Sequence, residues 1–269
     1  MPHPSVQSNG CNLAYEIRGA GPPVVLIQGV GVCGSGWGPQ VDRLCQAHTC
    51  LTFDNRAMGA SQPPGGQLTI AQMAEDVFAL MDRQSWYNAH LIGHSMGGLI
   101  ALRAALQEPR RVRSLSLLCT FARGSDATRI SARMAWIGMR TRLGPRAWRR
   151  KAFLQLVSPP GKLPPDSVLL AERVSELFGH DIADQPPVVM KQLAAMKQCD
   201  LTPRLGELAG IRTLVVSARH DIIARPYSGK TIAAGIPGAR YVEIPDAAHG
   251  VPILEQDRIN DLLLEHLAG

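Results

Sequence analysis

The stretch that decides the fold is Gly93-His94-Ser95-Met96-Gly97-Gly98, which follows the apolar run 89–92 and precedes a helical pattern. A serine between a buried strand and a helix lies on a sharp turn with a strained backbone. Residues two before and two after the serine crowd together, so this spacing requires the small Gly93 and Gly97. No P-loop lysine and no Gly-x-Gly-x-x-Gly spacing accompanies the turn. The pattern therefore favours a nucleophilic Ser95 over a phosphate-binding loop.

Strands and helices alternate on both sides of this turn. Asn9-Gly10 is a favoured two-residue hairpin turn, and Thr69 is a suitable N-cap for a helix that runs to about residue 83. Apolar runs predict strands at 24–27, 50–53, 89–92, 115–119, 213–217 and 241–244, and helical spacing predicts helices at 96–106 and about 253–267. The alternation predicts an α/β fold with a mostly parallel central sheet and helices on both faces.

The alternation stops near Phe121, and only helical patterns follow as far as Pro203. This interruption predicts a helical cap at 122–203, inserted into a core domain made of 1–121 and 204–269. Most apolar residues of the cap should be core, and a few should line an apolar pocket. The candidates are Met134, Trp136, Ile137, Met139, Trp148, Phe153, Leu154, Leu170 and Phe178.

Length, composition and charge bound the function. A chain of 269 residues with 45% hydrophobic residues can bury one large core. The 28 basic and 22 acidic residues give a net charge of +6, and the densest basic run, 140–151, is typical of the solvated face of an amphipathic helix. Because no nucleic-acid motif accompanies this run, we expect no nucleic-acid partner.

Cysteine usage and the N-terminus indicate the compartment. The six cysteines form no CxxC pair and no cluster with zinc-ligand spacing, so they predict buried free thiols and no metal site. The N-terminal residues include no apolar signal-peptide segment, and no run approaches the roughly 20 apolar residues needed to span a bilayer. We therefore expect a reduced, cytoplasmic protein with no membrane partner.

A serine hydroxyl needs a base within hydrogen-bond reach, and His249 is the candidate. It follows the strand 241–244 in Pro245-Asp246-Ala247-Ala248-His249-Gly250, where small neighbours allow the loop to fold over the edge of the sheet. The other histidines are expected at the surface or in packing roles. His94 adjoins Ser95, but the turn should point its ring away from the hydroxyl.

The base needs an orienting acid, and Asp221 is the candidate. Asp221 follows the strand 213–217 by a short turn, so its carboxylate should lie at the carboxyl edge of the sheet, where open α/β folds gather their sites. Asp246 is the main rival, but it is too close in sequence to His249 to reach the ring easily.

At these residues the chain resembles the α/β-hydrolase superfamily, in particular its cap-bearing esterases and lactonases. The resemblance extends to the segment 53–61, whose Asp-Asn-Arg opening is similar to that of 3-oxoadipate enol-lactonases, although Ala57 replaces the usual glycine. It also covers Gln28-Gly29-Val30, where the family usually has His-Gly-x. The resemblance implies that Val30 and Met96 supply the two amides of an oxyanion hole, and that the segment 53–61 is structural.

The expected activity is hydrolysis of a small or medium ester or lactone through an acyl-enzyme, with no cofactor. A serine at the turn argues against dehalogenases and epoxide hydrolases of this superfamily, which have aspartate there. The same three residues could instead support carbon–carbon bond hydrolysis, thioester hydrolysis or cofactor-free perhydrolysis, or belong to a ligand receptor with low turnover. An uncharged apolar acyl group is preferred, although Arg123 or Arg129 could bind a carboxylate. The oligomeric state is open.

Overall fold

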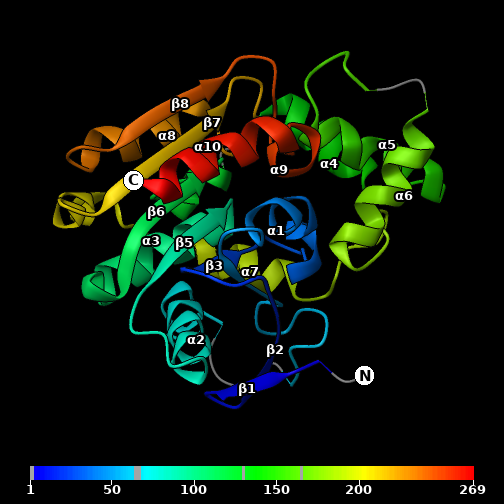
Figure 1. Ribbon diagram of the computed structural model, residues 1–269. Helices are drawn as coiled ribbons and strands as arrows, with labels where there is room; N and C mark the ends of the chain where they lie inside the picture. Colours follow the sequence, from blue (N-terminus) through cyan, green and yellow to red (C-terminus); the bar gives the residue numbers. More distant parts are fainter. Residues whose placement is uncertain (1–2, 64–67, 129–130, 164–165) are drawn as a thin grey trace.

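A central sheet of eight strands organises the molecule, in the order β1-β2-β4-β3-β5-β6-β7-β8 (Figure 1). The computed structural model describes residues 3–63, 68–128, 131–163 and 166–269. The strands are β1 (Ser5–Ser8), β2 (Cys11–Arg18), β3 (Pro23–Ile27), β4 (Thr49–Phe53), β5 (Ala89–His94), β6 (Val112–Leu118), β7 (Arg212–Ala218) and β8 (Arg240–Ile244). All six predicted strands are present, each within a few residues of its predicted bounds.

The sheet is parallel except where it contains β1 and β2. β1 pairs with β2, and β2 with β4, in antiparallel register. Asn9 and Gly10 join the first two strands with φ of 43° and 79°, the positive values that the predicted hairpin turn requires. The later pairs, from β4 to β8, are parallel. Their carboxyl ends therefore meet at one edge of the sheet.

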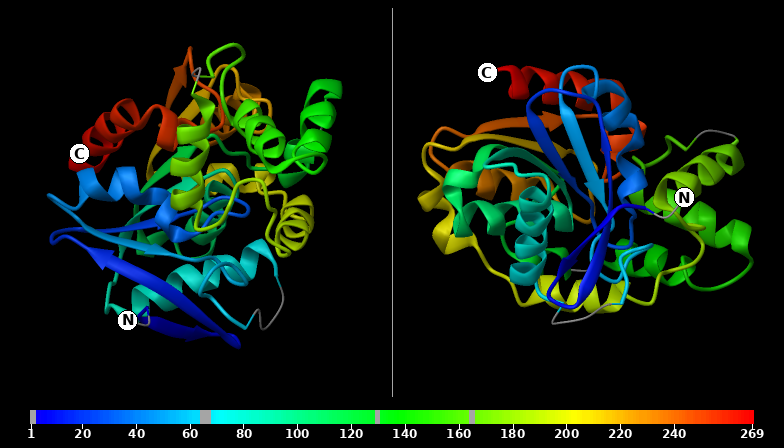
Figure 2. Two further views of the ribbon diagram at one scale, coloured as in Figure 1. Left: turned by 90° about the vertical axis from the view of Figure 1, so that its right-hand side faces the viewer. Right: turned by 60° about the horizontal axis from the view of Figure 1, so that its bottom comes forward.

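Helices cover both faces of the sheet, as the alternation predicted. α2 (Ile70–Arg83), α3 (Met96–Gln107) and α8 (Pro226–Gly235) pack on one face, and α1 (Gly38–Leu44) and α10 (Gln256–Ala268) on the other (Figure 2). Thr69 caps α2 as expected, because its hydroxyl accepts a hydrogen bond from the Gln72 amide at 3.1 Å.

The C-terminal helix differs from its prediction, because it is two helices. α9 (Val251–Leu254) ends at Glu255, whose φ of −123° and ψ of 37° are not helical, and α10 begins at the next residue. The Gln40 side-chain amide donates to the Pro252 carbonyl at 2.7 Å, which satisfies an oxygen that a continuous helix would have bonded itself. A tertiary contact thus replaces one helical hydrogen bond.

In the described residues between β6 and β7 lie the α-helices α4 (Ala132–Arg140), α5 (Arg146–Val157), α6 (Ser167–Phe178) and α7 (Val189–Lys197). They lie beyond the carboxyl edge of the sheet and are coloured green to yellow in Figure 1. Part of this insertion has its own apolar cluster around Leu154, Ala171, Val174 and Ile182. No helix in the described part of the chain is long and apolar enough to cross a membrane.

Candidate active site

Ser95 lies on the turn between β5 and α3, in a conformation that few side chains adopt. Its φ of 55° and ψ of −120° carry the strain predicted from the sequence. Hydrogen bonds tie this backbone to the end of β6 and the residues after it: the Ser95 amide donates to the Leu118 carbonyl at 3.0 Å, and the Thr120 hydroxyl donates to the Ser95 carbonyl at 2.6 Å. The neighbouring strand β6 therefore fixes the position of the serine.

The glycines around Ser95 are required by close backbone approach. A Cβ at Gly93 would overlap the carbonyl of Gly97, and one at Gly97 would overlap the carbonyl of Ile27. Gly29, in the loop after β3, is less constrained: a Cβ there would lie 3.1 Å from the Ser95 Cβ, a tight side-chain contact rather than an overlap with backbone. The turn and the loop after β3 consequently pack against each other around the hydroxyl.

The structure brings His249 and Asp221 together at the carboxyl edge of the sheet. His249 Nδ1 lies 2.7 Å from Asp221 Oδ2, and both side chains are buried. The other carboxylate oxygen accepts from the amides of Ile223 at 2.7 Å and Ala224 at 2.9 Å. These hydrogen bonds hold the carboxylate in a fixed orientation. The rival Asp246 is exposed and instead pairs with Lys162 at 3.4 Å.

His94 lies where the sequence reasoning did not expect it. Its ring packs against the His249 ring with centroids 4.7 Å apart, and its Nε2 donates to the His249 carbonyl at 2.9 Å. Burial, and secondarily the adjacent His249, lower the His94 pKa to about 3, so the ring is neutral. The sequence reasoning, which considered His94 only in relation to the Ser95 hydroxyl, did not anticipate these contacts, because they form when the loop carrying His249 folds back over the ring.

Two backbone amides border the serine without protein partners. Val30 lies in the loop after β3, and Met96 is the first residue of α3. Neither N–H donates a hydrogen bond to any residue in the described part of the chain. The Met96 side chain is buried in the core, so only its amide can take part. Gln28, which replaces the usual histidine of this loop, accepts from the Gly29 amide at 3.2 Å, the hydrogen bond within the loop that a glutamine can make.

Ser95 and His249 open into one cavity of about 250 Å³ beneath the insertion. Four of the predicted pocket candidates line it: Met134, Phe153, Leu154 and Phe178. Two of the remaining candidates, Trp136 and Trp148, have exposed side chains. No lysine or arginine is among the lining residues of the described chain. Arg123 is not among them and pairs with Asp200 at 2.8 Å, whereas Arg129 falls outside the described residues.

Comparisons with known proteins identify the family to which this fold belongs. The family model for the alpha/beta hydrolase fold matches residues 22–256. The chain belongs to the α/β-hydrolase family. A protein of Azorhizobium caulinodans, provisionally named a carbamate hydrolase (RutD), is 30% identical to this α/β hydrolase over 263 residues, which cover 97% of each chain.

Solved structures of other α/β hydrolases superimpose over nearly the whole chain. The enol-lactonase from Burkholderia xenovorans LB400 has a TM-score of 0.82 and 29% identity, and covers 99% of this chain and 100% of its own. A thermophilic esterase from Thermogutta terrifontis has a TM-score of 0.80 and 25% identity, with 98% and 97% covered. This α/β hydrolase therefore shares its whole architecture with proteins named for ester and lactone chemistry.

The segment after β4 is structural in this α/β hydrolase, as expected. Arg56 and Asp76 form a fully buried ion pair, with Nε to Oδ2 at 2.7 Å and Nη2 to Oδ1 at 2.5 Å. The Asn55 side chain donates to the Gln28 carbonyl at 3.0 Å, which ties this segment to the loop after β3. Ala57 has φ of 68°, which explains why glycine is usual at its position.

One residue near the site escaped the sequence reasoning. Cys119 follows β6 with φ of 44° and its thiol contacts the Asp221 carboxylate. Burial, then the charge of Asp221, hold the pKa of this thiol well above its usual value, so it stays protonated and can donate to the carboxylate. No sequence pattern marked it, because the contact depends on the pairing of β6 with β7. Among the described residues, no group of three His, Cys, Asp or Glu side chains could hold a metal ion.

Proposed function

We propose that this α/β hydrolase cleaves a carboxylic ester or lactone through an acyl-enzyme. Ser95 Oγ attacks the carbonyl carbon while His249 Nε2 takes its proton, and Asp221 keeps the Nδ1 hydrogen in place and stabilises the imidazolium. His249 then returns the proton to the leaving oxygen. Water, deprotonated by the same ring, releases the acid and restores the serine. The observation that carries the proposal is the His249–Asp221 hydrogen bond at the cavity that also contains the strained Ser95.

The two free amides complete the proposed mechanism. The Val30 and Met96 N–H groups are assigned to the oxyanion that forms on the carbonyl oxygen. Each such donor lowers the barrier by about 3 kcal/mol in other hydrolases. The N-terminus of α3 adds a favourable field for the negative charge. Their lack of partners in the described chain supports the assignment, because a donor already used within the protein could not bind the oxyanion.

The substrate class follows from the cavity under the cap, which we assign to residues 122–203, with 1–121 and 204–269 as the core domain. The cavity is lined mainly by aliphatic and aromatic side chains, and the one carboxylate among its described lining residues, Asp184, is paired with Arg146 and Arg149. A carboxylate on the substrate would find no cation among the lining residues of the described chain. Burying an unpaired charge costs several kcal/mol. The acyl group is therefore neutral and apolar.

A matched pair of chromogenic esters tests both parts of the proposal. p-Nitrophenyl butyrate and p-nitrophenyl hemisuccinate have acyl chains of equal length, and only the second carries a carboxylate. We expect the neutral ester to be favoured at least about 100-fold in kcat/KM, and Ser95→Ala to abolish both activities. Equal rates in wild type and Ser95→Ala would refute the nucleophile, and a preference for the hemisuccinate would refute the substrate class. A panel adding lactones and thioesters separates the reaction types.

A further inference from the structure

The core holds the residues just before Val30 in the loop that carries the Val30 amide. Before Val30, the Gln28 side chain accepts from the Gly29 amide at 3.2 Å, and Asn55 donates to the Gln28 carbonyl at 3.0 Å. These contacts hold the peptide units that precede Val30. An amide direction also depends on the peptide units that follow, and among the described residues the next hydrogen bond from this loop to the core is that of the Gly34 N–H to Asp54 Oδ1, at 2.8 Å.

The peptide units after Val30 are held by the cap. The Gly31 N–H donates to Gln192 Oε1 on α7 at 2.9 Å, and the Gly31 carbonyl accepts from His180 Nε2 at 2.7 Å. Gly31 itself has φ of 71°, and a Cβ there would lie 3.0 Å from the Val189 side chain. The loop therefore touches the cap closely, and this contact together with the positive φ favours glycine here.

Stability alone does not account for Gln192. Its side chain is fully buried, and its Nε2 has no hydrogen-bond partner among the described residues. An orphaned buried donor costs about 1–3 kcal/mol. Turning the amide over would place that NH₂ group against the Gly31 N–H, so the oxygen must face Gly31. An apolar residue of the same size would avoid the cost of the unpaired Nε2 group, but it could not accept the hydrogen bond from the Gly31 N–H.

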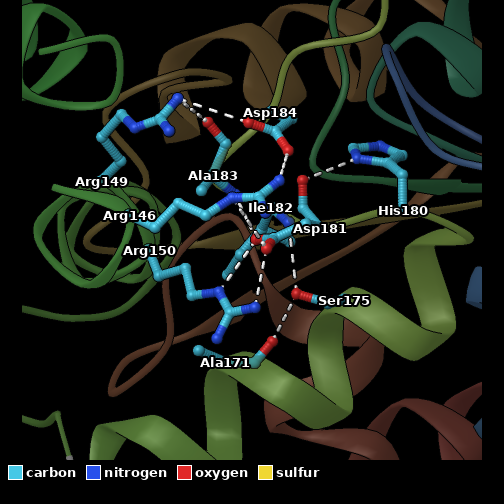
Figure 3. Close-up of polar contacts among 10 residues, drawn as sticks. All are labelled: Arg146, Arg149, Arg150, Ala171, Ser175, His180, Asp181, Ile182, Ala183 and Asp184. Atoms are coloured by element: carbon cyan, nitrogen blue, oxygen red, sulfur yellow. Dashed lines mark hydrogen bonds and ion pairs between the residues drawn. The ribbon is translucent and has the colours of Figure 1, made fainter.

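His180 is in turn held by a network of charged residues within the cap (Figure 3). Its Nδ1 lies 2.9 Å from the Asp181 carbonyl oxygen. The Asp181 carboxylate accepts two hydrogen bonds from Arg150, at 2.9 and 2.7 Å. Arg146 and Arg149 of the same helix, α5, pair with Asp184. Both ring nitrogens face carbonyl oxygens, which only accept, so a neutral ring donates to one of them; the shorter contact, 2.7 Å against 2.9 Å, places the hydrogen on Nε2, toward Gly31.

We propose that His180 and Gln192 are positioning residues that aim the Val30 amide, so that the oxyanion hole is complete only when the cap is seated on the core. This inference rests on the proposed function, since it assigns Val30 to that function's oxyanion. Neither side chain reaches the reacting atoms in this role. Each acts through Gly31, one on its N–H and the other on its carbonyl.

Paired substitutions test the proposal. His180→Phe keeps a ring without the donor, and His180→Gln restores an N–H donor. Gln192→Met keeps the length without the acceptor, and Gln192→Glu restores an acceptor oxygen. Lys191→Gln, an exposed change on the same helix, is the control. Each protein is assayed for kcat and KM with p-nitrophenyl butyrate, and for inhibition by a butyl boronic acid, which forms a tetrahedral anion on the serine.

We expect His180→Phe and Gln192→Met to lower kcat about 10- to 100-fold, a fraction of the loss seen on deleting an oxyanion donor. KM should stay within about two-fold, boronate affinity should fall in proportion to kcat, and His180→Gln should recover most of the loss. A merely structural role would raise KM or lower the melting temperature at unchanged kcat, and that result overturns the inference.

The same experiment separates this inference from the proposed function. If wild type hydrolyses the ester and both deletion variants keep its kcat, the positioning role is wrong and the proposed function stands. If wild type neither hydrolyses esters nor binds the boronate, the proposed function is wrong and the positioning role falls with it. His180→Gln and Gln192→Glu keep a polar partner for Gly31, so one variant at each position is expected to fold as wild type does.

Discussion

Replacing Asp221 with asparagine tests the orientation of His249 more sharply than removing either residue. One oxygen of this carboxylate accepts from the amides of Ile223 and Ala224, and the other from His249 Nδ1. Asparagine has a single side-chain oxygen, and the two backbone amides can be satisfied only if that oxygen faces them. The NH₂ group then points at Nδ1, which must become an acceptor. The hydrogen moves to Nε2, and the ring can no longer take a proton from Ser95.

The expected loss of kcat therefore reflects a ring in the wrong tautomer, and not merely the absence of one hydrogen bond. The equivalent change in an unrelated serine protease lowers kcat about 10⁴-fold, which is about 5 kcal/mol of barrier. We expect Asp221→Asn to lose kcat on p-nitrophenyl butyrate by this order, with a circular dichroism spectrum and melting temperature close to those of wild type. Asp246→Asn is the control, because Asp246 is exposed and pairs with Lys162, and it should retain activity. A kcat for Asp221→Asn within ten-fold of wild type would refute the reasoning.

Three further predictions concern stability, each measured as the free energy of unfolding in urea. Gly97→Ala should cost several kcal/mol, because its Cβ would overlap a backbone carbonyl. Gly138→Ala in α4, where a Cβ would meet open space, should instead gain about 0.5–1 kcal/mol, and equal effects of the two substitutions would contradict the packing argument. Asp76→Asn should cost about 3–5 kcal/mol, because it removes the negative charge opposite a buried guanidinium. Asp42→Asn, in an exposed pair, should change stability by less than about 1 kcal/mol, and an equally small effect of Asp76→Asn would contradict this prediction. Burial lowers the His90 pKa to about 4 in the folded state. Between pH 6.5 and pH 4 the unfolded chain therefore binds a proton that the native state does not. As the pH is lowered through this range, the free energy of unfolding decreases by up to about 1.4 kcal/mol per pH unit. His90→Gln should flatten that decline, and an unchanged slope would contradict the assignment.

The parts of the fold that the sequence predicted are those set by local patterns. Buried parallel strands such as β3 and β5 are short, continuous apolar runs, and the Asn9-Gly10 turn needs no tertiary information. By contrast α1 and α8 went unpredicted. α1 begins at Gly38-Pro39, and α8 contains Gly229 and ends at Gly235, so each is short and carries residues that usually mark loops. Their helical form depends on packing against the sheet.

The candidate site divides in the same way. Ser95, His249 and Asp221 stand out because each follows a predicted strand at a fixed offset. The contacts that connect them to the rest of the molecule span long separations that no local pattern encodes. His94 bonds the backbone of a residue 155 positions away, and His180 bonds one 149 positions away. These contacts arise from how two loops and the cap fold over the sheet edge, which only the three-dimensional structure reveals.

The central claim is that Ser95 is the activated nucleophile, and covalent labelling tests it most directly. The protein is treated with a fluorophosphonate, digested, and the modified peptide is identified by mass spectrometry. We expect one label per chain, on the peptide that contains Ser95, and its loss in Ser95→Ala and in His249→Ala. A label on another residue, or no label on a folded wild-type protein, would contradict the account.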